Sequence, residues 1–355
     1  TKSGVFASPE TGYTGSVLPI EQRFALVALL LSTACFSPVV PSGLACSEED
    51  NCPSKQTCYQ GICMASAPAA DAASAFDGAV PVDAGPCTGE QIFEYSGVIE
   101  SFAVPSCARV LTIEAFGAQG GGGETMPAIG GKGAGMTGEF DVFGDEVLGV
   151  LVGGRGIDAI PNTTTQMYNP QGGGTGGGGS FVVYSDQQPL IIAAGGGGAV
   201  GLLPGGPGQI LPLGQAGASD TNTGAPGGVA GAGGTTQPGL TGFHSGTGGA
   251  GMLGDGVGAS VGDTSVYGTA NQPPKSFLNG GAGGIAGSEG RNGGFGGGGS
   301  AGFTGGGGGG YTGGGSGFLL VSERGGGGGG SVSLGDNQDN AVGVQADNGK
   351  IVFSW

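Results

Sequence analysis

The sequence predicts an all-β protein in which an antiparallel β-sandwich carries packed polyglycine II helices and follows a small disulfide-rich module. Three observations predict this fold class. Short segments have strand character, long glycine tracts separate them, and no stretch after residue 35 has convincing helical periodicity. Because nothing in this pattern supplies the helices that connect parallel strands, we expect the strands to pair antiparallel in a sandwich.

The clearest strand is residues 109–116, in which apolar and more polar positions alternate. Leu111, Ile113 and Ala115 share one face of this segment, and Val110, Thr112, Glu114 and Phe116 share the other. The other expected strands are residues 91–95, 101–104, 136–143, 147–152, 181–184, 190–194, 318–322 and 350–355.

Turn residues connect several of these strands. Gly144-Asp145 predicts a tight hairpin between the two strands that flank it. Residues 185–189 predict a second hairpin, and Asn348-Gly349 predicts a turn before the terminal strand.

Glycine tracts fill the chain between the expected strands, and 90 of the 355 residues are glycine. Ordering a glycine costs roughly 0.5–1 kcal/mol more than ordering an alanine, so isolated tracts would be disordered. They can order together as helices with three residues per turn, because chains without Cβ atoms approach closely and hydrogen-bond to one another. The tracts are residues 117–123, 172–179, 195–198, 281–299, 305–310 and 325–330.

The residues between the glycines limit this interpretation. Residues 281–303 keep no strict period of three, which excludes a collagen-type helix. Large side chains such as Phe295, Phe303 and Tyr311 would lie on the outer faces of the helices or plug the sandwich.

Charge excludes one class of partner. The formal net charge is -17 and the 10 Lys and Arg residues form no cluster, so the chain lacks the cationic surface that nucleic acid requires. Only 10% of the residues are charged and the mean hydropathy is +0.11, which is not typical of a solvated disordered chain.

The N-terminal region, residues 1–35, has the features of an export signal. Residues 24–34 are an apolar run after Arg23, too short to span a bilayer. The run ends in Ser32-Thr33-Ala34-Cys35, which resembles a bacterial lipobox although Ser32 replaces the usual large aliphatic residue. We therefore expect a lipid on Cys35 and attachment to the outer membrane or cell surface, with simple cleavage and secretion into the medium as the alternative.

The number of cysteines agrees with this expectation, because removing Cys35 from the seven leaves an even set. Residues 46–63 contain four cysteines and little apolar surface, so they form a small module that only cross-links can hold. Zinc is the alternative to disulfides there, but exported cysteines usually oxidise. The cysteines expected to form disulfides are Cys46, Cys52, Cys58, Cys63, Cys87 and Cys107, the last two bracketing the first strands of the large domain.

The remaining organisation is simple. Residues 64–86 are rich in Ala, Pro and Asp without periodicity and predict a flexible linker. Residues 87–355 form the glycine-rich β domain, and the cysteine-rich module resembles those of secreted deltaproteobacterial proteins. That resemblance implies that the first cysteine pairs with the third and the second with the fourth.

Motifs for chemistry are weak in this chain. Residues 196–201 fit GxGxxG, but the following LLPGGPG cannot form the helix that a dinucleotide site requires. Residues 153–158 fit one unit of a Ca²⁺-binding nonapeptide, which needs stacked repeats. His244 stands alone, without a second histidine or a free cysteine. We therefore expect no enzyme activity, no cofactor and no metal site.

Several sequence segments resemble those of a known family: AFGAQGGGGE at residues 115–124, VGGRG at 152–156, PLIIAAGGGG at 189–198, GGGGGGYTGGGSG at 305–317 and the C-terminal GKIVFSW. Over residues 88–355 the chain is similar to the glycine-rich domain of bacterial surface proteins and of the ectodomains of anaplastic lymphoma kinase and leukocyte tyrosine kinase. The resemblance implies a sandwich of tumour-necrosis-factor-like topology with packed polyglycine helices, used for binding.

The expected function follows from the signal, the odd cysteine and the strand-bracketed tracts. We expect a non-enzymatic cell-surface lipoprotein whose glycine-rich domain serves adhesion, binding of an unknown protein or glycan, or envelope structure. The alternatives are a soluble secreted protein that binds ice or glycans, and a passive matrix protein with disordered glycine tracts.

Overall fold

The computed structural model describes two separate parts of the chain. It gives the backbone of strands at Thr57–Tyr59 and Ile62–Met64, and it describes residues 87–124, 128–160, 172–218, 224–236, 245–258, 271–287, 290–317 and 325–355. The chain divides into one unit at residues 1–82 and a second at 83–355. In the first unit, β1 (Thr57–Tyr59) and β2 (Ile62–Met64) pair antiparallel with Cys58 opposite Cys63.

The second unit contains two five-stranded antiparallel sheets, which confirms the predicted all-β sandwich. The first sheet, in spatial order, is β10 (Val332–Ser333), β9 (Pro189–Ala193), β8 (Ser180–Val183), β7 (Val147–Leu151) and β4 (Ile99–Ala103). The second is β11 (Ala341–Gln345), β6 (Gly133–Asp141), β5 (Val110–Phe116), β12 (Lys350–Ser354) and β3 (Glu90–Glu94).

The main hydrophobic core lies between the two sheets. Leu111, Ile113 and Ala115 of β5 are fully buried in it, as their alternation with polar positions predicts. The rings of Phe102 and Phe353, one from each sheet, stack with their centroids 4.1 Å apart. Burial of aromatic side chains from both layers stabilises the sandwich.

A second hydrophobic cluster covers the other face of the first sheet. Phe181 of β8 stacks on Phe277 of the short helix η1 (Phe277–Asn279), with ring centroids 5.0 Å apart. Phe295 and Tyr311, from the glycine-rich region, pack against the same cluster. The sheet is therefore buried on both faces, which explains why β8 (SFVV) is apolar at consecutive positions instead of alternating.

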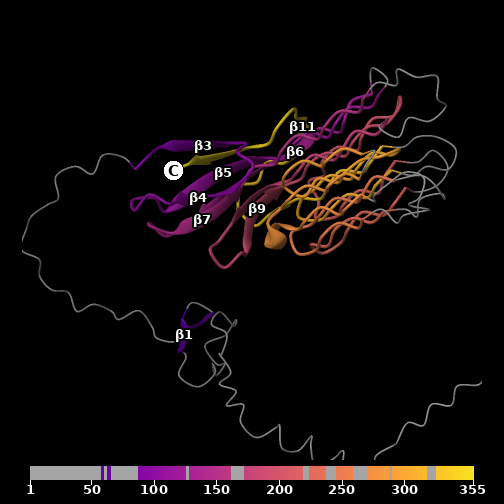
Figure 1. The fold of residues 1–355 in the computed structure, drawn as a ribbon. Helices are drawn as coiled ribbons and strands as arrows, with labels where there is room; N and C mark the ends of the chain where they lie inside the picture. The colour runs from indigo at the N-terminus through magenta and orange to yellow at the C-terminus, as the bar shows by residue number, and fades with distance from the viewer. Residues whose placement is uncertain are drawn as a thin grey trace, which may run out of the picture. The chain divides into compact units, whose positions relative to one another are not determined.

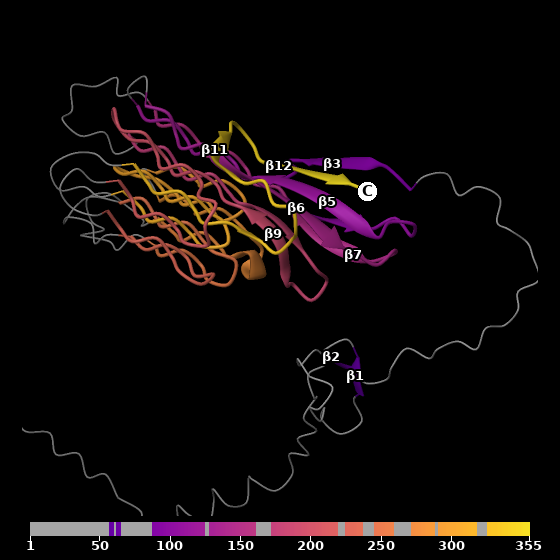
Figure 2. The ribbon, with the colours of Figure 1, turned by 180° about the vertical axis from the view of Figure 1, so that it is seen from behind.

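The strands continue into a bundle of glycine-rich tracts that run side by side beyond one end of the sheets (Figures 1 and 2). Residues 305–310 show how the tracts pack. This tract exchanges backbone hydrogen bonds with six others: residues 172–179, 194–200, 245–251, 296–302, 312–317 and 325–331. Six neighbours around one helix is hexagonal packing.

The hydrogen bonds between tracts follow a period of three residues, which is the turn of a polyproline II-type helix. The N–H groups of Gly117, Gly120 and Gly123 all donate to residues 128–134, whereas those of Ala118 and Gly121 donate to residues 172–179. The glycine tracts are therefore ordered polyglycine II helices within the described part of the chain, as the sequence predicts.

Absence of a strict period in residues 281–303 has a structural cause. The chain turns within this segment, and Gly296 and Gly297 take φ values of 93° and 84° that favour glycine. The period is lost because the segment contains turns between separate helices. Phe303, for which an outer or plugging position was expected, is buried, 4% exposed.

The predicted Gly144-Asp145 hairpin is wrong, although a turn is present. Asp145 takes a φ of 68°, but β6 pairs with β5 and β11 while β7 pairs with β4 and β8. The turn therefore carries the chain from one sheet to the other, which a local dipeptide signal cannot reveal. The second predicted hairpin is confirmed, since β8 and β9 pair antiparallel.

Other expectations have mixed outcomes. Strands β10 and β11 were not expected, and the strand expected at residues 318–322 lies outside the described residues. Cys87 and Cys107 form a disulfide that brackets β3 and β4, with their Cα atoms 5.7 Å apart. This bond links the start of the domain to the loop before β5.

Candidate functional site

The helices at the perimeter of the bundle expose one residue in three. In residues 128–134, Ile129 and Lys132 are exposed, while the other five residues are buried. A helix with three residues per turn places every third residue on one side, so inward positions must be small and outward positions are free to vary. The outward positions are where this domain can carry chemical specificity.

One perimeter helix and an adjoining helical hairpin form a continuous surface, which we call the outer face: residues 211–218 and 224–236. The hairpin turns at residues 229–232, where the Ala232 N–H donates to the Val229 carbonyl, and its second arm folds back so that the Thr235 N–H donates to the Pro226 carbonyl. The N–H groups of Gly214 and Gly217 donate to the carbonyls of Gly228 and Ala225 and hold residues 211–218 antiparallel to the first arm of the hairpin. The exposed residues of the outer face are Leu211, Pro212, Leu213, Gln215, Ala218, Pro226, Val229, Ala230 and Ala232. No residue in these two ranges is charged.

The backbone at the outer face has free hydrogen-bonding groups. The N–H groups of Ala216, Gly227 and Gly233 have no hydrogen-bond partner among the residues that the structure describes. All three are only partly exposed, and their small side chains allow another backbone to approach. The outer face is thus an open edge of the hexagonal packing.

The neighbouring perimeter helix, residues 203–208, is closed by proline. Gly205 and Gly208 donate to Ile129 and Lys132 of the helix on one side, and Gly206 donates to Gly326 in the interior. The two remaining positions of this repeat, Pro204 and Pro207, have no N–H group to present. This edge cannot be extended by the same pattern of hydrogen bonds.

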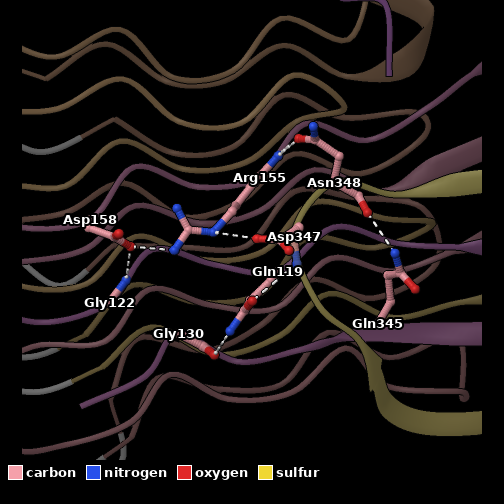
Figure 3. A network of polar contacts seen from close by, with 8 residues as sticks. All are labelled: Gln119, Gly122, Gly130, Arg155, Asp158, Gln345, Asp347 and Asn348. Atoms are coloured by element: carbon pink, nitrogen blue, oxygen red, sulfur yellow. Dashed lines mark hydrogen bonds and ion pairs between the residues drawn. The ribbon is translucent and has the colours of Figure 1, made fainter. Parts of the chain in front are cut away.

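A polar network joins the bundle to the turn between β11 and β12 (Figure 3). Gln119 exchanges two hydrogen bonds with Asp347: its N–H donates to the Asp347 carbonyl at 2.8 Å, and its Oε1 accepts from the Asp347 N–H at 3.1 Å. The Gln119 Nε2 donates to the Gly130 carbonyl at 3.2 Å. One glutamine therefore ties its own helix to a neighbouring helix and to the β11–β12 turn.

Arg155 completes this network from the next helix. Its Nη2 donates to Asp158 Oδ1 at 2.7 Å, and its Nε lies 3.6 Å from Asp347 Oδ1, an ion-pair distance too long for a hydrogen bond. Its backbone N–H donates to Asn348 Oδ1 at 2.8 Å, and Asp158 also accepts from the Gly122 N–H at 2.7 Å. Both carboxylates are engaged within the protein, so the network acts as a brace.

A second polar cluster fixes the turn that carries Phe277. Asp255 accepts hydrogen bonds from Lys275 Nζ at 2.9 Å, and from the Ser276 N–H and Asn279 Nδ2 at 2.8 Å each. Burial acts to raise the pKa of Asp255, but these hydrogen bonds and the Lys275 charge outweigh burial and lower it to about 2. The ionised carboxylate thereby holds η1 against the sheet.

The predicted site residues are only partly within the described residues. Cys35, Cys46, Cys52 and His244 lie outside them, and of Cys58 and Cys63 only the backbone is described. The predicted pairing of the cysteine-rich module therefore stays a prediction. Cys87 and Cys107 are joined, as expected.

The two weak ligand motifs are part of the bundle. Residues 196–200 form a polyglycine helix that ends where Val200 and Leu203 exchange two backbone hydrogen bonds, and no α-helix follows. In residues 153–158 the Asp158 carboxylate binds Arg155 and the Gly122 N–H. Among the described residues, no group of three or more His, Cys, Asp or Glu could hold a metal ion.

Sequence reasoning missed the brace residues Gln119, Arg155 and Asp347 as a group. Asn348 was marked only as a turn residue, and Gln119 is the one amide side chain in its glycine tract. A long polar residue inside a tract of small ones is the signal that could have marked a cross-connection.

Comparison of the chain with protein-family models and with curated proteins finds no match. Within the described ranges, no helix has the length and apolar character needed to cross a membrane.

Proposed function

We propose that the chain is a non-enzymatic, exported cell-surface protein, anchored by a lipid on Cys35, whose glycine-rich domain is a rigid binding module for adhesion or envelope structure. The support comes from the construction of the bundle. Each central helix is surrounded by others, and its backbone groups bind its neighbours instead of a ligand.

The observation that carries the proposal is the lack of space inside the bundle. A Cβ atom built on Gly196, Gly307 or Gly313 would overlap a carbonyl oxygen of a neighbouring helix. A bundle interior that cannot hold a methyl group cannot hold a buried substrate, so recognition by the bundle must take place on its outside. A rigid surface with regularly spaced side chains suits binding better than catalysis.

The order of the tracts also bears on the alternatives. A passive matrix of disordered glycine tracts requires backbone amides that are free to exchange, whereas the described tracts are linked by hydrogen bonds throughout. We therefore favour a binding module over a passive matrix.

The anchor is tested by metabolic labelling of cells with a palmitate analogue. We expect label on the wild-type chain and on Ser37→Ala, a neighbouring control, and no label on Cys35→Ala. Equal absence of label in all three forms would refute the anchor. Protease treatment of intact cells tests surface display, and protection of residues 87–355 in intact cells, lost on lysis, would refute it.

Binding is tested by comparing the adhesion of cells with and without the chain to host-cell or glycan-coated surfaces, and their adhesion to one another. We expect adhesion that depends on the chain. Identical adhesion of both strains on all these surfaces, together with unchanged envelope integrity in detergent, would contradict the proposed role.

A further inference from the structure

One edge of the second sheet is an unpaired strand. β3 pairs with β12 through all five of its residues without a register shift, and no described strand lies on its other side. At the start of this ladder Gly89 and Trp355 exchange two backbone hydrogen bonds, of 2.9 and 3.1 Å. The backbone groups of an antiparallel strand alternate in direction, so every second residue after Gly89 also faces β12. Glu90, Ile92 and Glu94 therefore direct their N–H and carbonyl groups away from the sheet.

This edge lacks the features that usually prevent a strand from pairing with another chain. Proteins protect such edges with lysine, proline, a bulge or a very short strand. Strand β10 has only two residues, and β11 has a register shift and Gly343 at a φ of 60°. Strand β3 (EQIFE) has none of these features, and Glu90, Ile92 and Glu94 are all exposed. The edge is therefore able to accept another extended strand.

The side chains beside these free backbone groups are acidic. Glu90 and Glu94 lie on either side of Ile92, on the face of the sheet that points away from the core. Neither carboxylate has a hydrogen bond or an ion pair within the described part of the chain. Strand β4 (IESFA) is the other regular edge strand of five residues, and its exposed side chains are uncharged. Of the two regular edges, only β3 thus favours a partner of one charge.

A second copy of the chain does not fit this edge. Two β3 strands that pair antiparallel around Ile92 would place Glu90 of one copy opposite Glu94 of the other, and like charges directly opposite destabilise a strand pair. The chain has no complementary segment of its own, because Lys275 and Arg291, its closest pair of cationic residues, are 16 positions apart. Residues 64–86 contain three Asp and no Lys or Arg.

Charge and free backbone groups together define the partner. We infer that β3 binds an extended basic segment of another protein, which joins the second sheet as an additional antiparallel strand. The segment places cationic side chains opposite Glu90 and Glu94 and an apolar side chain opposite Ile92, so its pattern is cation, any residue, apolar, any residue, cation. The net charge of -17 attracts such a segment from a distance.

This inference names a partner class for the proposed binding module and rests on that proposal. The test uses the purified full chain carrying Cys35→Ser, so that neither lipid attachment nor the cell surface enters the measurement. Absence of binding in solution and failure of cell adhesion are therefore separate results.

The probe is the peptide TKTVTKT with both ends blocked, and TETVTET is its charge-reversed control. NMR titration measures the Kd, and hydrogen exchange measures protection of the β3 amides. We expect TKTVTKT to bind and to slow exchange at Glu90, Ile92 and Glu94, and we expect no binding of TETVTET.

Backbone methylation of the probe separates strand addition from simple charge attraction. With the peptide valine opposite Ile92, the valine N–H faces β3 and the N–H of the next threonine faces solvent. A methyl group on the valine nitrogen should abolish binding, because it removes a hydrogen bond to the edge. A methyl group on the nitrogen of that threonine should leave the Kd unchanged.

Two protein variants locate the peptide on the edge. We expect the double variant Glu90→Gln, Glu94→Gln to raise the Kd at least about fivefold, since both opposite-charge pairs are lost. Glu114→Gln is the matched control, because Glu114 lies on β5 of the same sheet with β12 between it and β3. We expect this variant to bind like the parent. Circular dichroism checks that both variants fold.

The outcomes decide the inference. Selective binding of TKTVTKT that is lost on valine methylation and weakened in the double variant supports it. No binding of TKTVTKT at its highest soluble concentration overturns it, as does equal binding of TETVTET or of the valine-methylated peptide. Equal weakening by Glu114→Gln would place the peptide across the sheet and overturn it. A parent that dimerises with its β3 amides protected before peptide is added also overturns it. If the double variant does not fold, the methylated peptides decide on the parent.

Discussion

Substituting Gly307 by alanine tests whether the bundle depends on the absence of Cβ atoms. Gly307 lies in the central helix formed by residues 305–310 and is buried. Its N–H donates to the Thr247 carbonyl at 3.0 Å, and its carbonyl accepts from the Gly299 N–H at 2.8 Å. A Cβ at this position would overlap the carbonyl oxygen of Gly314, which belongs to a third helix.

The expected cost can be worked out from these contacts. Overpacking a rigid interior typically costs about 1–3 kcal/mol. If the helices separate enough to break one of the two hydrogen bonds, an unsatisfied buried group adds about 1–3 kcal/mol. Alanine also restricts the unfolded chain, which offsets roughly 0.4–1 kcal/mol of this loss in the free energy of unfolding. The net loss in the free energy of unfolding is therefore about 3 kcal/mol, which for a domain of this size lowers Tm by roughly 6–9 °C.

The assay is chemical and thermal unfolding, with hydrogen exchange as a local measurement. The control is Gly149→Ala in β7, because the nearest atom to its added Cβ is Val183 Cγ2 at 3.1 Å, a side-chain methyl that can move. We expect Gly149→Ala to change the free energy of unfolding by less than about 1 kcal/mol. Amides of residues 245–251 should exchange faster in Gly307→Ala only. Equal stability of Gly307→Ala and wild type would show that the bundle is not packed as described.

Two further predictions concern the polar clusters. Arg155→Gln should lower the free energy of unfolding by about 1 kcal/mol and speed hydrogen exchange at the amides of Gly122 and Asp347. Arg155→Lys should not restore the lost stability, because a single ammonium group cannot replace the planar guanidinium. Unchanged exchange at these amides would contradict the role of the network. Asp255→Asn should also cost about 1 kcal/mol near neutral pH, since a neutral amide accepts these hydrogen bonds more weakly. Because the folded-state pKa of Asp255 lies below the unfolded value, its contribution is present above about pH 4 and is lost as pH falls toward 2. Urea unfolding across this range should show the stabilities of wild type and Asp255→Asn converging, and a difference that does not depend on pH would contradict the role of the charge.

The sequence predicts the sandwich well because its evidence is local. The alternation in β5 places Leu111, Ile113 and Ala115 on one face, and a strand with that pattern has one way to bury them. The glycine tracts could also be assigned to polyglycine helices, because chains without Cβ atoms approach closely enough in that conformation to hydrogen-bond to one another. These steps need only the chemistry of neighbouring residues.

Pairing between distant segments could not be predicted in the same way. The Asp347 N–H bonds to Gln119, 228 positions away, and no periodicity connects the two. The helices of the bundle have nearly the same composition, so nothing in a glycine tract specifies which neighbour it contacts. Strand β10, with two residues, is too short to give an alternating pattern, and β11 contains Gly343 with a φ of 60°.

The lack of charge on the outer face is not a requirement of the fold. Outward positions on other perimeter helices carry Lys132, Asp158 and Lys275, all of them exposed, so the three-residue packing accepts charge wherever a side chain points to solvent. Charge at Gln215 or Ala218, both of them exposed, would meet the same geometry. Solubility favours charged side chains at such positions. The absence of charge on the outer face is therefore a property of its sequence and not of the packing of its helices.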